Sequence, residues 1–426
     1  MKVAIKQKVL ANALEKGSVA ALTNEAQTDT SNMSLLVQAV KITANAKKLT
    51  FESCTNLIGV KHVLSVSKED GVLVQDDGCA FVAANELSRW VKAQGEDATI
   101  NITLSELSSP EFLNAVNDDD IDDSLAIKKT GVLKLVSKDK TKSGGNKWEL
   151  DSYDPSQREM VGFGKKDKGI KCFEVPSKPL ESILKIVKIA SIDNDPDHIY
   201  DSVSIQIYKD NVYFSTTDTK RCALYKMSTA TDIQSDDTLL VPLNLLETAS
   251  KISDKNENVV IYYNEAINRV FVEQKNLDIR VVCVEKDKTS KFPSIGKLID
   301  KKYGPFADIS KSVFKGMLTT ASIVNSKMAL FTLKSDKDIM VVKAISENGK
   351  YRPNVSSYGV NKRGQNDDDI SKVWSVSHLK EVTDVVKNDN IKLLIPSDER
   401  SLKIVDEDNE DFSYFAMAIN NSSLYN

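Results

Sequence analysis

The residue types that most often perform catalysis occur in this chain without the spacing that catalysis requires. Asp218 and Arg221 stand three residues apart at the end of an expected strand, a position typical of a local structural ion pair. Gly162-Phe163-Gly164, followed by Gly169, lacks the spacing of a phosphate-binding loop. No Ser-His-Asp or paired-carboxylate arrangement follows from the sequence. We therefore expect a protein that is not an enzyme and that needs no cofactor.

Metal-binding residues are equally scattered. The five cysteines never form a CxxC pair, and the three histidines are far apart in the sequence: Cys54, Cys79, Cys172, Cys222, Cys283, His62, His198 and His378. Structural zinc sites need these ligands in close pairs, so no metal site is expected. Buried free thiols in a reducing cytoplasm are the simpler interpretation.

Bulk composition is that of a globular protein. Of 426 residues, 41% are hydrophobic and 28% charged, and the net charge of −4 gives no overall indication of nucleic-acid binding. No apolar run approaches the roughly 18–20 residues that span a bilayer. The N-terminal residues 1–6 alternate like a strand and lack the apolar stretch of a signal peptide. We expect a cytoplasmic protein without a membrane partner.

The same unit recurs three times: a strand, a lysine-bearing amphipathic helix, several strands and a second helix. The first helices are expected after residues 3–5, 173–175 and 307–309, and the second near residues 81–82, 240–241 and 373–374. A repeat of roughly 130–170 residues is too long for a solenoid and predicts three similar domains. Alternating strands separated by polar turns predict an α+β fold with antiparallel sheets and two helices per domain. The expected domains are residues 1–170, 171–303 and 304–426.

Two segments interrupt this pattern. The region of about 105–130 contains the acidic run Asp118–Asp123, which predicts a solvated loop inserted in the first domain. Residues 138–146, rich in Lys, Ser and Gly, are typical of a hairpin tip.

Positive charge is concentrated on the expected helices. The six helical segments together carry +8 in a chain of net charge −4, so the remainder carries −12. Basic helices that cross a duplex would attract phosphates without reading sequence. The alternative is that lysines simply occupy the polar side of any helix. The residues expected to face DNA are Lys6, Lys8, Lys16, Arg89, Lys92, Lys178, Lys185, Lys188, Lys251, Lys311 and Lys315.

A family resemblance appears at residues 215–224, Ser215-Thr216-Thr217-Asp218-Thr219-Lys220-Arg221-Cys222-Ala223-Leu224. This stretch resembles Ala-Thr-Asp-Gly-His-Arg-Leu-Ala of the bacterial sliding clamp, the beta subunit of DNA polymerase III. Four further fragments resemble that family in the same order: Val241-Pro242, Lys291-Phe292-Pro293, Ser375-Val376-Ser377-His378 and Tyr414-Phe415-Ala416-Met417-Ala418-Ile419.

The resemblance implies a crescent of three domains that dimerises into a closed ring around double-stranded DNA. Helices would line the hole, and contacts with DNA would be to phosphates and mobile. Such a clamp tethers DNA polymerase, and it also binds the clamp loader, through short peptides. The runner-up interpretation is a monomeric clamp-like module that binds replication proteins without encircling DNA, and a third is an unrelated α+β enzyme.

The resemblance also implies a peptide cleft between the second and third domains. An apolar cleft with a polar rim suits the side chains of an extended peptide. The alternative is that its Met and Leu residues are simply core. The matching positions are Tyr200, Thr217, Thr219, Lys220, Arg221, Cys222, Pro293, Lys297, Leu298, Met328, Ser375, His378, Leu402, Phe415, Ala416, Met417, Ala418 and Ile419.

Several positions depart from the family pattern. Thr219 and Lys220 replace a Gly and a His, Cys222 replaces a Leu, and Ala418 replaces a Pro. The chain also continues beyond the resemblance through residues 422–426. A virus-encoded clamp with its own partners would show such changes.

The ring interface is expected at two places. Lys147-Trp148-Glu149-Leu150 matches the family's edge strand of the first domain, and Ser322-Ile323 matches the third-domain helix that receives it. Exposed Trp148 and Leu150 on an edge strand would promote aggregation unless a second copy covered them. The alternative is that Trp148 belongs to an ordinary domain core.

Overall fold

The computed structural model describes most of the chain. The described residues are 1–23, 26, 34–113, 126–138, 145–158, 160, 169–193, 195–208, 211–228, 238–284, 289, 292–323, 327–344, 354–363, 368–396, 401–406 and 409–419. The acidic run 118–123, the Gly-Phe-Gly stretch 162–164, most of the expected hairpin tip and the tail 422–426 lie outside them. The chain divides into two compact units, residues 1–177 with 248–282 and residues 178–247 with 283–426.

Helices begin where the sequence predicts them. The six longer ones are α1 (Gln7–Gly17), α4 (Ala84–Lys92), α6 (Ser177–Val187), α7 (Leu243–Ile252), α10 (Lys311–Ile323) and α11 (Val376–Val385). Shorter turns of helix are η1 (Ala20–Leu22), α3 (Ser34–Val37), η2 (Pro155–Gln157), η3 (Lys188–Ala190) and α9 (Ile295–Ile299). Each longer helix has one apolar face, as in α1, where Leu10, Ala13 and Leu14 are buried.

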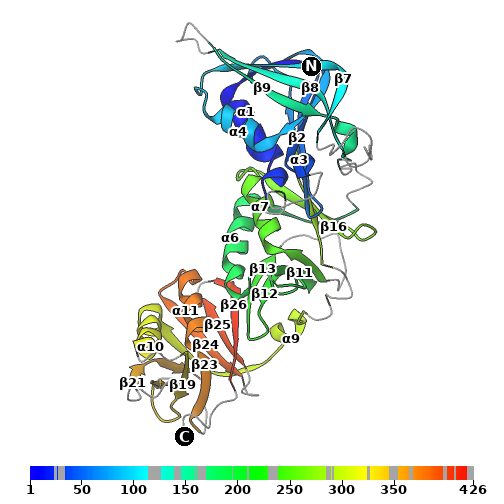
Figure 1. Ribbon diagram of the computed structural model, residues 1–426. Coiled ribbons are helices and arrows are strands. Elements are labelled where there is room, and N and C mark those ends of the chain that lie inside the picture. The colour runs from blue at the N-terminus through cyan, green and yellow to red at the C-terminus, as the bar shows by residue number, and fades with distance from the viewer. Residues whose placement is uncertain are drawn as a thin grey trace. The chain divides into compact units, whose positions relative to one another are not determined.

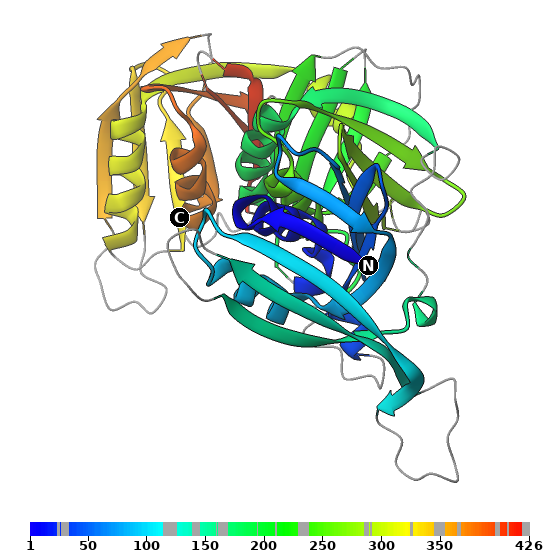
Figure 2. The same cartoon turned by 90° about the horizontal axis from the view of Figure 1, so that it is seen from above.

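The first unit contains a five-stranded antiparallel sheet in the order β5-β1-β7-β8-β9. Its strands are β5 (Val72–Asp76), β1 (Lys2–Lys6), β7 (Thr99–Leu113), β8 (Ile127–Lys138) and β9 (Asn146–Tyr153). In Figure 2 the long hairpin of β7 and β8 extends beyond the ends of the neighbouring strands. The described part of the expected acidic insert therefore belongs to this hairpin.

An eight-stranded antiparallel sheet completes the first unit, in the order β10-β15-β16-β17-β4-β3-β2-β6. Its strands are β10 (Ile170–Pro176), β15 (Asn258–Asn264), β16 (Arg269–Gln274), β17 (Leu277–Val282), β4 (Ile58–Ser65), β3 (Lys48–Cys54), β2 (Ala39–Ala44) and β6 (Gly78–Ala83). The pairing of β17 with β4 joins strands far apart in the sequence. We call this pairing the β4–β17 junction.

Helices α1 and α4 pack against each other in the first unit (Figure 1). Their apolar faces share one core with both sheets, including Leu10 and Leu87 from the helices, Phe51 from β3 and Leu135 from β8. The end of α1 approaches β3 so closely that a Cβ on Gly17 would lie 2.4 Å from Cβ of Phe51. Glycine is therefore required at this helix terminus.

The second unit contains a nine-stranded antiparallel sheet in the order β14-β11-β12-β13-β26-β25-β24-β18-β22. Its strands are β14 (Thr238–Pro242), β11 (Ser202–Tyr208), β12 (Asn211–Thr217), β13 (Arg221–Ser228), β26 (Asn409–Met417), β25 (Ser401–Asp406), β24 (Asn390–Pro396), β18 (Tyr303–Ser310) and β22 (Asn361–Arg363). Here β13 and β26 join distant parts of the sequence. We call this pairing the β13–β26 junction.

A four-stranded antiparallel sheet in the order β21-β20-β19-β23 completes the second unit. Its strands are β21 (Asn354–Gly359), β20 (Ile339–Ala344), β19 (Met328–Leu333) and β23 (Ile370–Ser375). Helices α10 and α11 lie next to each other beside these strands (Figure 2). The predicted α+β class with antiparallel sheets and few helices is confirmed, whereas the domain boundaries at 170 and 303 stay a prediction.

The described residues show neither a membrane span nor a metal-binding cluster. No described helix is both long and apolar enough to cross a bilayer. Within the same residues, no group of three or more His, Cys, Asp or Glu side chains is arranged to hold a metal ion.

Candidate functional site

The candidate site lies at the β13–β26 junction. Antiparallel pairing places Arg221 opposite Ala416 and Cys222 opposite Phe415. The backbone N–H of Met417 also donates to the carbonyl oxygen of Lys220 at 2.8 Å, which fixes the end of β26 to the turn between β12 and β13. The junction therefore holds residues 217–222 and 415–417 in one register.

The turn at residues 217–221 is held by its own side chains. Thr217 Oγ1 donates to the carbonyl oxygen of Arg221 at 2.6 Å and accepts from the N–H of Thr219 at 3.1 Å. Asp218 Oδ1 accepts from the N–H groups of Lys220 and Arg221, both at 2.8 Å. Such local side-chain bonds are what define an Asx-type turn. These bonds hold the turn in one conformation.

Thr219 has an unusual backbone conformation, with φ of 76°. Left-handed φ values are costly for a β-branched residue and easy for glycine. The resemblance places a glycine of the sliding-clamp family at this position. The turn therefore keeps a conformation that suits glycine although the residue is threonine.

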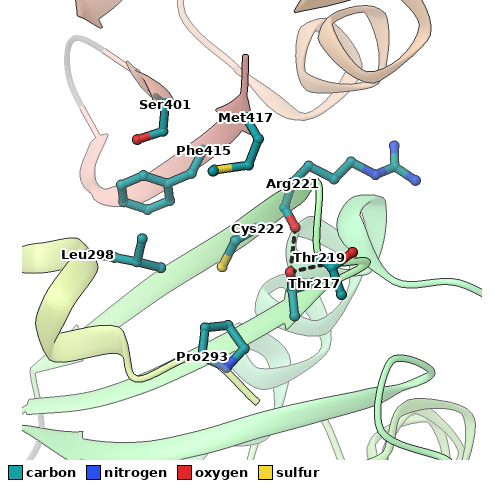
Figure 3. Close-up of a pocket in the computed structure, with 9 residues that line it drawn as sticks. All are labelled: Thr217, Thr219, Arg221, Cys222, Pro293, Leu298, Ser401, Phe415 and Met417. Carbon is teal, nitrogen blue, oxygen red and sulfur yellow. Dashed lines mark hydrogen bonds between the residues drawn. The ribbon is translucent and has the colours of Figure 1, made fainter. Parts of the chain in front are cut away.

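A pocket of about 240 Å³ opens beside this turn. Figure 3 shows Leu298, Pro293, Cys222 and Met417 converging on one space, whereas the guanidinium of Arg221 points away from it. We call it the junction pocket. Its described lining residues are Thr217, Thr219, Arg221, Cys222, Pro293, Leu298, Ser401, Phe415 and Met417.

The lining is mostly apolar and chemically inert. Met417 is 44% exposed, unusually so for a large apolar side chain, whereas Phe415 and Cys222 are buried. Burial raises the pKa of the Cys222 thiol to about 12, with Asp218 adding to the effect. The thiol is therefore neutral at pH 7 and is no nucleophile. This arrangement can hold an apolar side chain of a partner.

A charged cluster surrounds Arg221, which is one of the lining residues of the pocket. Arg221 Nε lies 3.0 Å from Asp218 Oδ2, and its Nη1 bonds to Glu381 on α11. Burial raises the pKa of Glu381, although the charge of Arg221 opposes this. The Asp218–Arg221 pair expected to be structural is thus a local ion pair that also connects the turn to α11.

His378 and Tyr414 extend this cluster. His378 Nε2 lies 3.9 Å from Asp218 Oδ2, and the pKa of His378 is lowered by burial and by Arg221, against the opposing effect of Asp218. The hydroxyl of the buried Tyr414 donates to the carbonyl oxygen of His378 at 2.9 Å. His378 is therefore mainly neutral at pH 7 and serves as a packed polar neighbour.

Eight of the residues predicted for the cleft line the junction pocket, but β25 faces it differently from the prediction. Leu402 is buried in the core, opposite Ala416 on β26, and Ser401 lines the pocket instead. Neighbouring strand residues point to opposite faces, so an error of one residue exchanges them. The alternation of Phe415, Ala416 and Met417 would have been the signal for the correct face of the adjacent strand.

The other predicted cleft residues do not belong to the described lining of the pocket. Met328 pairs with Ser375, and Ser375 accepts a bond from the N–H of His378 at the start of α11. The N–H of Ile419, one residue beyond Ala418, bonds to Val373 on β23, the strand that ends at Ser375. Three more predicted residues are outside the lining: Tyr200, packed against the Ile199 cluster, and the exposed lysines Lys220 and Lys297.

The basic residues predicted for the helices are mostly solvent-exposed. Lys16 and Lys311 are only half-buried, and the ammonium of Lys311 bonds to the carbonyl oxygen of Val386. Lys185 pairs with Glu181 at 2.7 Å and Lys188 with Glu247 at 2.9 Å. The exposed members are Lys6, Lys8, Arg89, Lys92, Lys178, Lys185, Lys188, Lys251 and Lys315.

The residues predicted for the ring interface differ in exposure. In the described chain β9 is the last strand of its sheet. Leu150 is only 5% exposed and belongs to the core, so the expectation that it is exposed is wrong because alternate β9 residues face inward. Trp148 stacks against Trp90 at 6.1 Å and lines an open pocket of about 340 Å³ with Glu86 and Arg89.

On α10 the two predicted interface residues lie in the last turn. Ser322 donates its hydroxyl to the carbonyl oxygen of Leu318 at 2.8 Å. Ile323 is 71% exposed, the largest exposed fraction among the exposed large apolar residues of the described chain.

Comparison with known proteins gives one family match and many structural matches. Residues 174–288 match the family described as DNA polymerase III beta subunit, central domain. No curated protein sequence matches the chain.

Solved structures of bacterial clamps are similar along the whole length. The DNA polymerase III subunit beta of Pseudomonas aeruginosa is 13% identical, with a TM-score of 0.75 over 98% of this chain and 100% of its own. The beta subunit from DNA polymerase of Streptococcus pyogenes is 14% identical, with a TM-score of 0.74 over 98% and 100%. The sliding clamp of Bacillus subtilis is 16% identical, with a TM-score of 0.73 over 99% of both chains.

The central match lies on the part of the chain that contributes β11 to β14, and the shared fold extends over all four sheets. The resemblance is thereby confirmed: residues 174–288 match the central domain of the DNA polymerase III beta subunit, and the chain shares the fold of the bacterial sliding clamps at low sequence identity.

Proposed function

We propose that this protein is a DNA sliding clamp. Two copies form a ring around double-stranded DNA in the cytoplasm, and the ring tethers the replicative polymerase and the clamp loader through peptides that bind the junction pocket. The clamp performs no catalysis, because its effect is to keep a partner on DNA by topology. The three proposed domains are residues 1–170, 171–303 and 304–426.

One observation carries the proposal: an exposed apolar pocket lies at the β13–β26 junction of a chain that has the clamp fold from end to end. Apolar pockets with a few polar rim groups are typical binding sites for anchor side chains of peptides. The neutral Cys222 thiol and the engaged Arg221 also favour binding over catalysis.

Two features favour ring formation. The edge strand β9 carries Trp148 beside an open pocket, and α10 ends in the exposed Ile323. Trp148 is half-buried against Trp90 and the core, and an edge strand such as β9 is stabilised when its unpaired backbone groups pair with another strand. In a head-to-tail dimer, Ile323 of one copy would enter the Trp148 pocket of the other, twice per ring.

The exposed basic residues of the helices support sequence-independent DNA binding. Lys8, Arg89, Lys178 and Lys315 are solvent-exposed on four different helices. Each ammonium or guanidinium group that approaches a phosphate releases condensed counterions, so the binding should weaken steeply with salt.

The first test is the mass in solution, measured by light scattering after gel filtration at micromolar concentration. A dimer is expected, at twice the chain mass of 47.1 kDa. A 47.1 kDa species would instead favour the runner-up, a monomeric clamp-like module. Ile323→Asp should convert the dimer to a monomer, whereas Ile192→Asp, also on an exposed isoleucine, should leave it intact.

The second test addresses encirclement. The protein is loaded on nicked circular DNA by its loader, and the DNA is then cut once. Release on linearisation is expected, because a ring slides off a free end. Retention on the linear DNA would exclude topological binding.

The third test addresses the pocket. The double variant Met417→Ala/Ile419→Ala should weaken peptide binding and leave the dimer mass unchanged. Ile192→Ala is a matched control, because Ile192 is an exposed apolar residue outside the pocket lining. Loss of the dimer in the double variant would mean that these residues serve the ring interface instead.

A further inference from the structure

A cysteine, a glycine and an arginine form one cross-strand row at the β4–β17 junction. Cys54, the last residue of β3, pairs with Gly59 on β4, and Gly59 pairs with Arg280 on β17. Residues that pair directly across neighbouring strands point to the same face of a sheet. Because Gly59 has no side chain, nothing in this row separates the guanidinium from the thiol, and Nη2 of Arg280 lies 3.5 Å from Sγ of Cys54.

Arg280 is a buried cation that meets no carboxylate among the described residues. It is only 7% exposed, and its Nε has no hydrogen-bond partner in that part of the chain. Burial lowers the pKa of Arg280, an effect that Cys54 opposes and the charge of Arg269 increases. A buried charge is costly unless an opposite charge or a polar group compensates it. The acid group that contacts this guanidinium is the thiol of Cys54.

Two further hydrogen bonds fix the position of Cys54. Its Sγ–H donates to the carbonyl oxygen of Thr55 at 3.1 Å, and its own carbonyl oxygen accepts from Nη2 of Arg158 at 2.8 Å. Thr55 is held in turn, because its Oγ1 accepts from the N–H of Ile58 at 3.1 Å. The sulfur therefore has a proton acceptor on one side and the guanidinium of Arg280 on the other.

Cys222 at the β13–β26 junction provides a comparison within the same molecule. Cys54 and Cys222 are both 5% exposed. Burial raises the pKa of Cys222 to about 12, and the carboxylate of Asp218 adds to this effect. The two thiols are therefore equally buried but have neighbours of opposite charge, a guanidinium beside Cys54 and a carboxylate beside Cys222.

From this arrangement we propose that Cys54 is a site of oxidation by peroxides, at which the guanidinium of Arg280 neutralises the attacking thiolate. The sulfur attacks one oxygen of hydrogen peroxide, an S–O bond forms as the O–O bond breaks, and the departing hydroxide takes up the thiol proton to form water. Cys54 is thereby oxidised by two electrons to a sulfenic acid, and the peroxide is reduced. The added oxygen gives the unpartnered Nε of Arg280 an acceptor. The inference does not depend on the proposed function.

Oxidation resolved by site tests the proposal on the intact full-length protein at pH 7. Hydrogen peroxide is added, a 1,3-diketone traps each sulfenic acid as it forms, and mass spectrometry of the digested protein follows the peptides of Cys54 and Cys222 separately. We expect Cys54 to be modified about tenfold faster than Cys222 or more, because the thiolate is the nucleophile and Cys222 is neutral at this pH. Equal rates for the two cysteines would overturn the proposal.

Removing the cation locates the effect. Arg280→Met should slow the modification of Cys54 by about tenfold, since an opposite charge at this distance favours a thiolate by that factor or more, and it should leave the rate of Cys222 unchanged. Arg269→Met is the matched control, because Arg269 lies on the neighbouring strand β16 and its Nη1 donates to the carbonyl oxygens of Ile267 and Asn268. It should change the rate of Cys54 by about twofold or less.

The direction of the change separates the proposal from a loss of structure. Local unfolding in Arg280→Met would expose the thiol and speed the modification of Cys54, whereas loss of the neutralising charge slows it. Faster modification of Cys54 in Arg280→Met would therefore overturn the proposal, because Arg280 would act only by keeping the junction closed. Slower modification of Cys54 at an unchanged rate of Cys222 would support it.

Discussion

Two junctions in this protein join strands that are far apart in the sequence, but the arginines at the two junctions have different charge environments. At the β4–β17 junction and at the β13–β26 junction, strands far apart in the sequence pair to continue one sheet. At each, an arginine stands opposite a small residue: Arg280 opposite Gly59, and Arg221 opposite Ala416.

The two arginines differ in what their charges meet. Arg221 binds two carboxylates, Asp218 and Glu381. Arg280 is buried, its Nη2 lies 3.5 Å from Cys54 Sγ, and its Nε has no hydrogen-bond partner in the described chain. Burial lowers the pKa of Arg280. Strand pairing alone therefore does not fix the charge balance, because the carboxylates of the β13–β26 junction come from the 217–221 turn and from α11.

Removing the compensated arginine should have the largest effect. Arg221→Met leaves Asp218 and Glu381 without a counter-ion, and we expect a loss of about 3 kcal/mol in the free energy of unfolding, since breaking a buried pair on one side is strongly destabilising. Urea unfolding is followed by the fluorescence of Trp374 in a Trp90→Phe/Trp148→Phe background, which restricts the signal to the second unit.

Lys337→Met is the control for this measurement, because Lys337 is exposed and lies 3.9 Å from its carboxylate neighbour Asp336. It should change stability by less than about 0.5 kcal/mol. A loss below about 1 kcal/mol in Arg221→Met would show that the two junctions are energetically alike.

Acid should weaken the β4–β17 junction next. His62 on β4 is buried, and burial lowers its pKa to about 4, with the charge of Lys16 adding to this and a bond to the carbonyl oxygen of Asn276 opposing it. The unfolded chain, with a pKa near 6.5, takes up the proton first as the pH falls. The contribution of His62 is therefore fully present above pH 6.5 and is lost between pH 6.5 and 4, by about 3 kcal/mol.

Replacing His62 tests whether this residue causes the acid sensitivity. His62→Gln should flatten the pH dependence of unfolding between pH 6.5 and 4, measured by the fluorescence of Trp90 and Trp148 in a Trp374→Phe background. His198→Asn is the control, because the side chain of His198 is 58% exposed beside Asp201. An unchanged pH profile in His62→Gln would contradict the assignment.

A smaller and opposite effect is expected in the turn of the β13–β26 junction. Thr219→Gly relieves the left-handed φ of 76° and should raise the free energy of unfolding by about 1 kcal/mol, after the greater entropy of glycine in the unfolded chain is subtracted. Thr217→Gly is the contrasting variant, since it removes a hydroxyl that bonds twice within the turn, and it should destabilise. Destabilisation by Thr219→Gly would mean that the threonine side chain, and not the backbone, holds the turn.

The smallest effect is expected from the uncompensated arginine. Arg280→Met keeps the apolar stem, removes a buried charge without a carboxylate partner among the described residues, and should change stability by no more than about 1 kcal/mol, in the stabilising direction. Urea unfolding of the first unit measures it. A loss similar to that of Arg221→Met would remove the difference between the junctions.

Much of the fold could be predicted from the sequence because it depends on local periodicity. The apolar spacing of Leu10, Ala13 and Leu14 predicts α1, and alternation predicts strands such as β11 and β12, since these patterns reflect burial of one face. The pairing of β4 with β17 could not be predicted in this way, because non-local strand pairing leaves no local signal. The division of the chain into domains stays a prediction.

The candidate site, too, could be predicted only in part from the sequence. Cys222, Pro293, Leu298 and Met417 were predicted for the cleft by resemblance, and they line one pocket. Ser401 was missed and Leu402 chosen, because the face that a strand residue occupies depends on register with its neighbour. The inward orientation of Leu150 was missed for the same reason.

The amino-acid sequence sets the residue types available to this protein, with basic residues on helices and apolar anchors in strands. Long-range packing sets which charges are compensated and where a pocket opens. Lys301 follows α9, Ser401 and Lys403 lie on β25, and Phe415 lies on β26, and they meet beside one cavity because β25 pairs with β26. Local periodicity records which face of an element is buried, but the partner of that face is set by long-range packing, and the site is built from those partners.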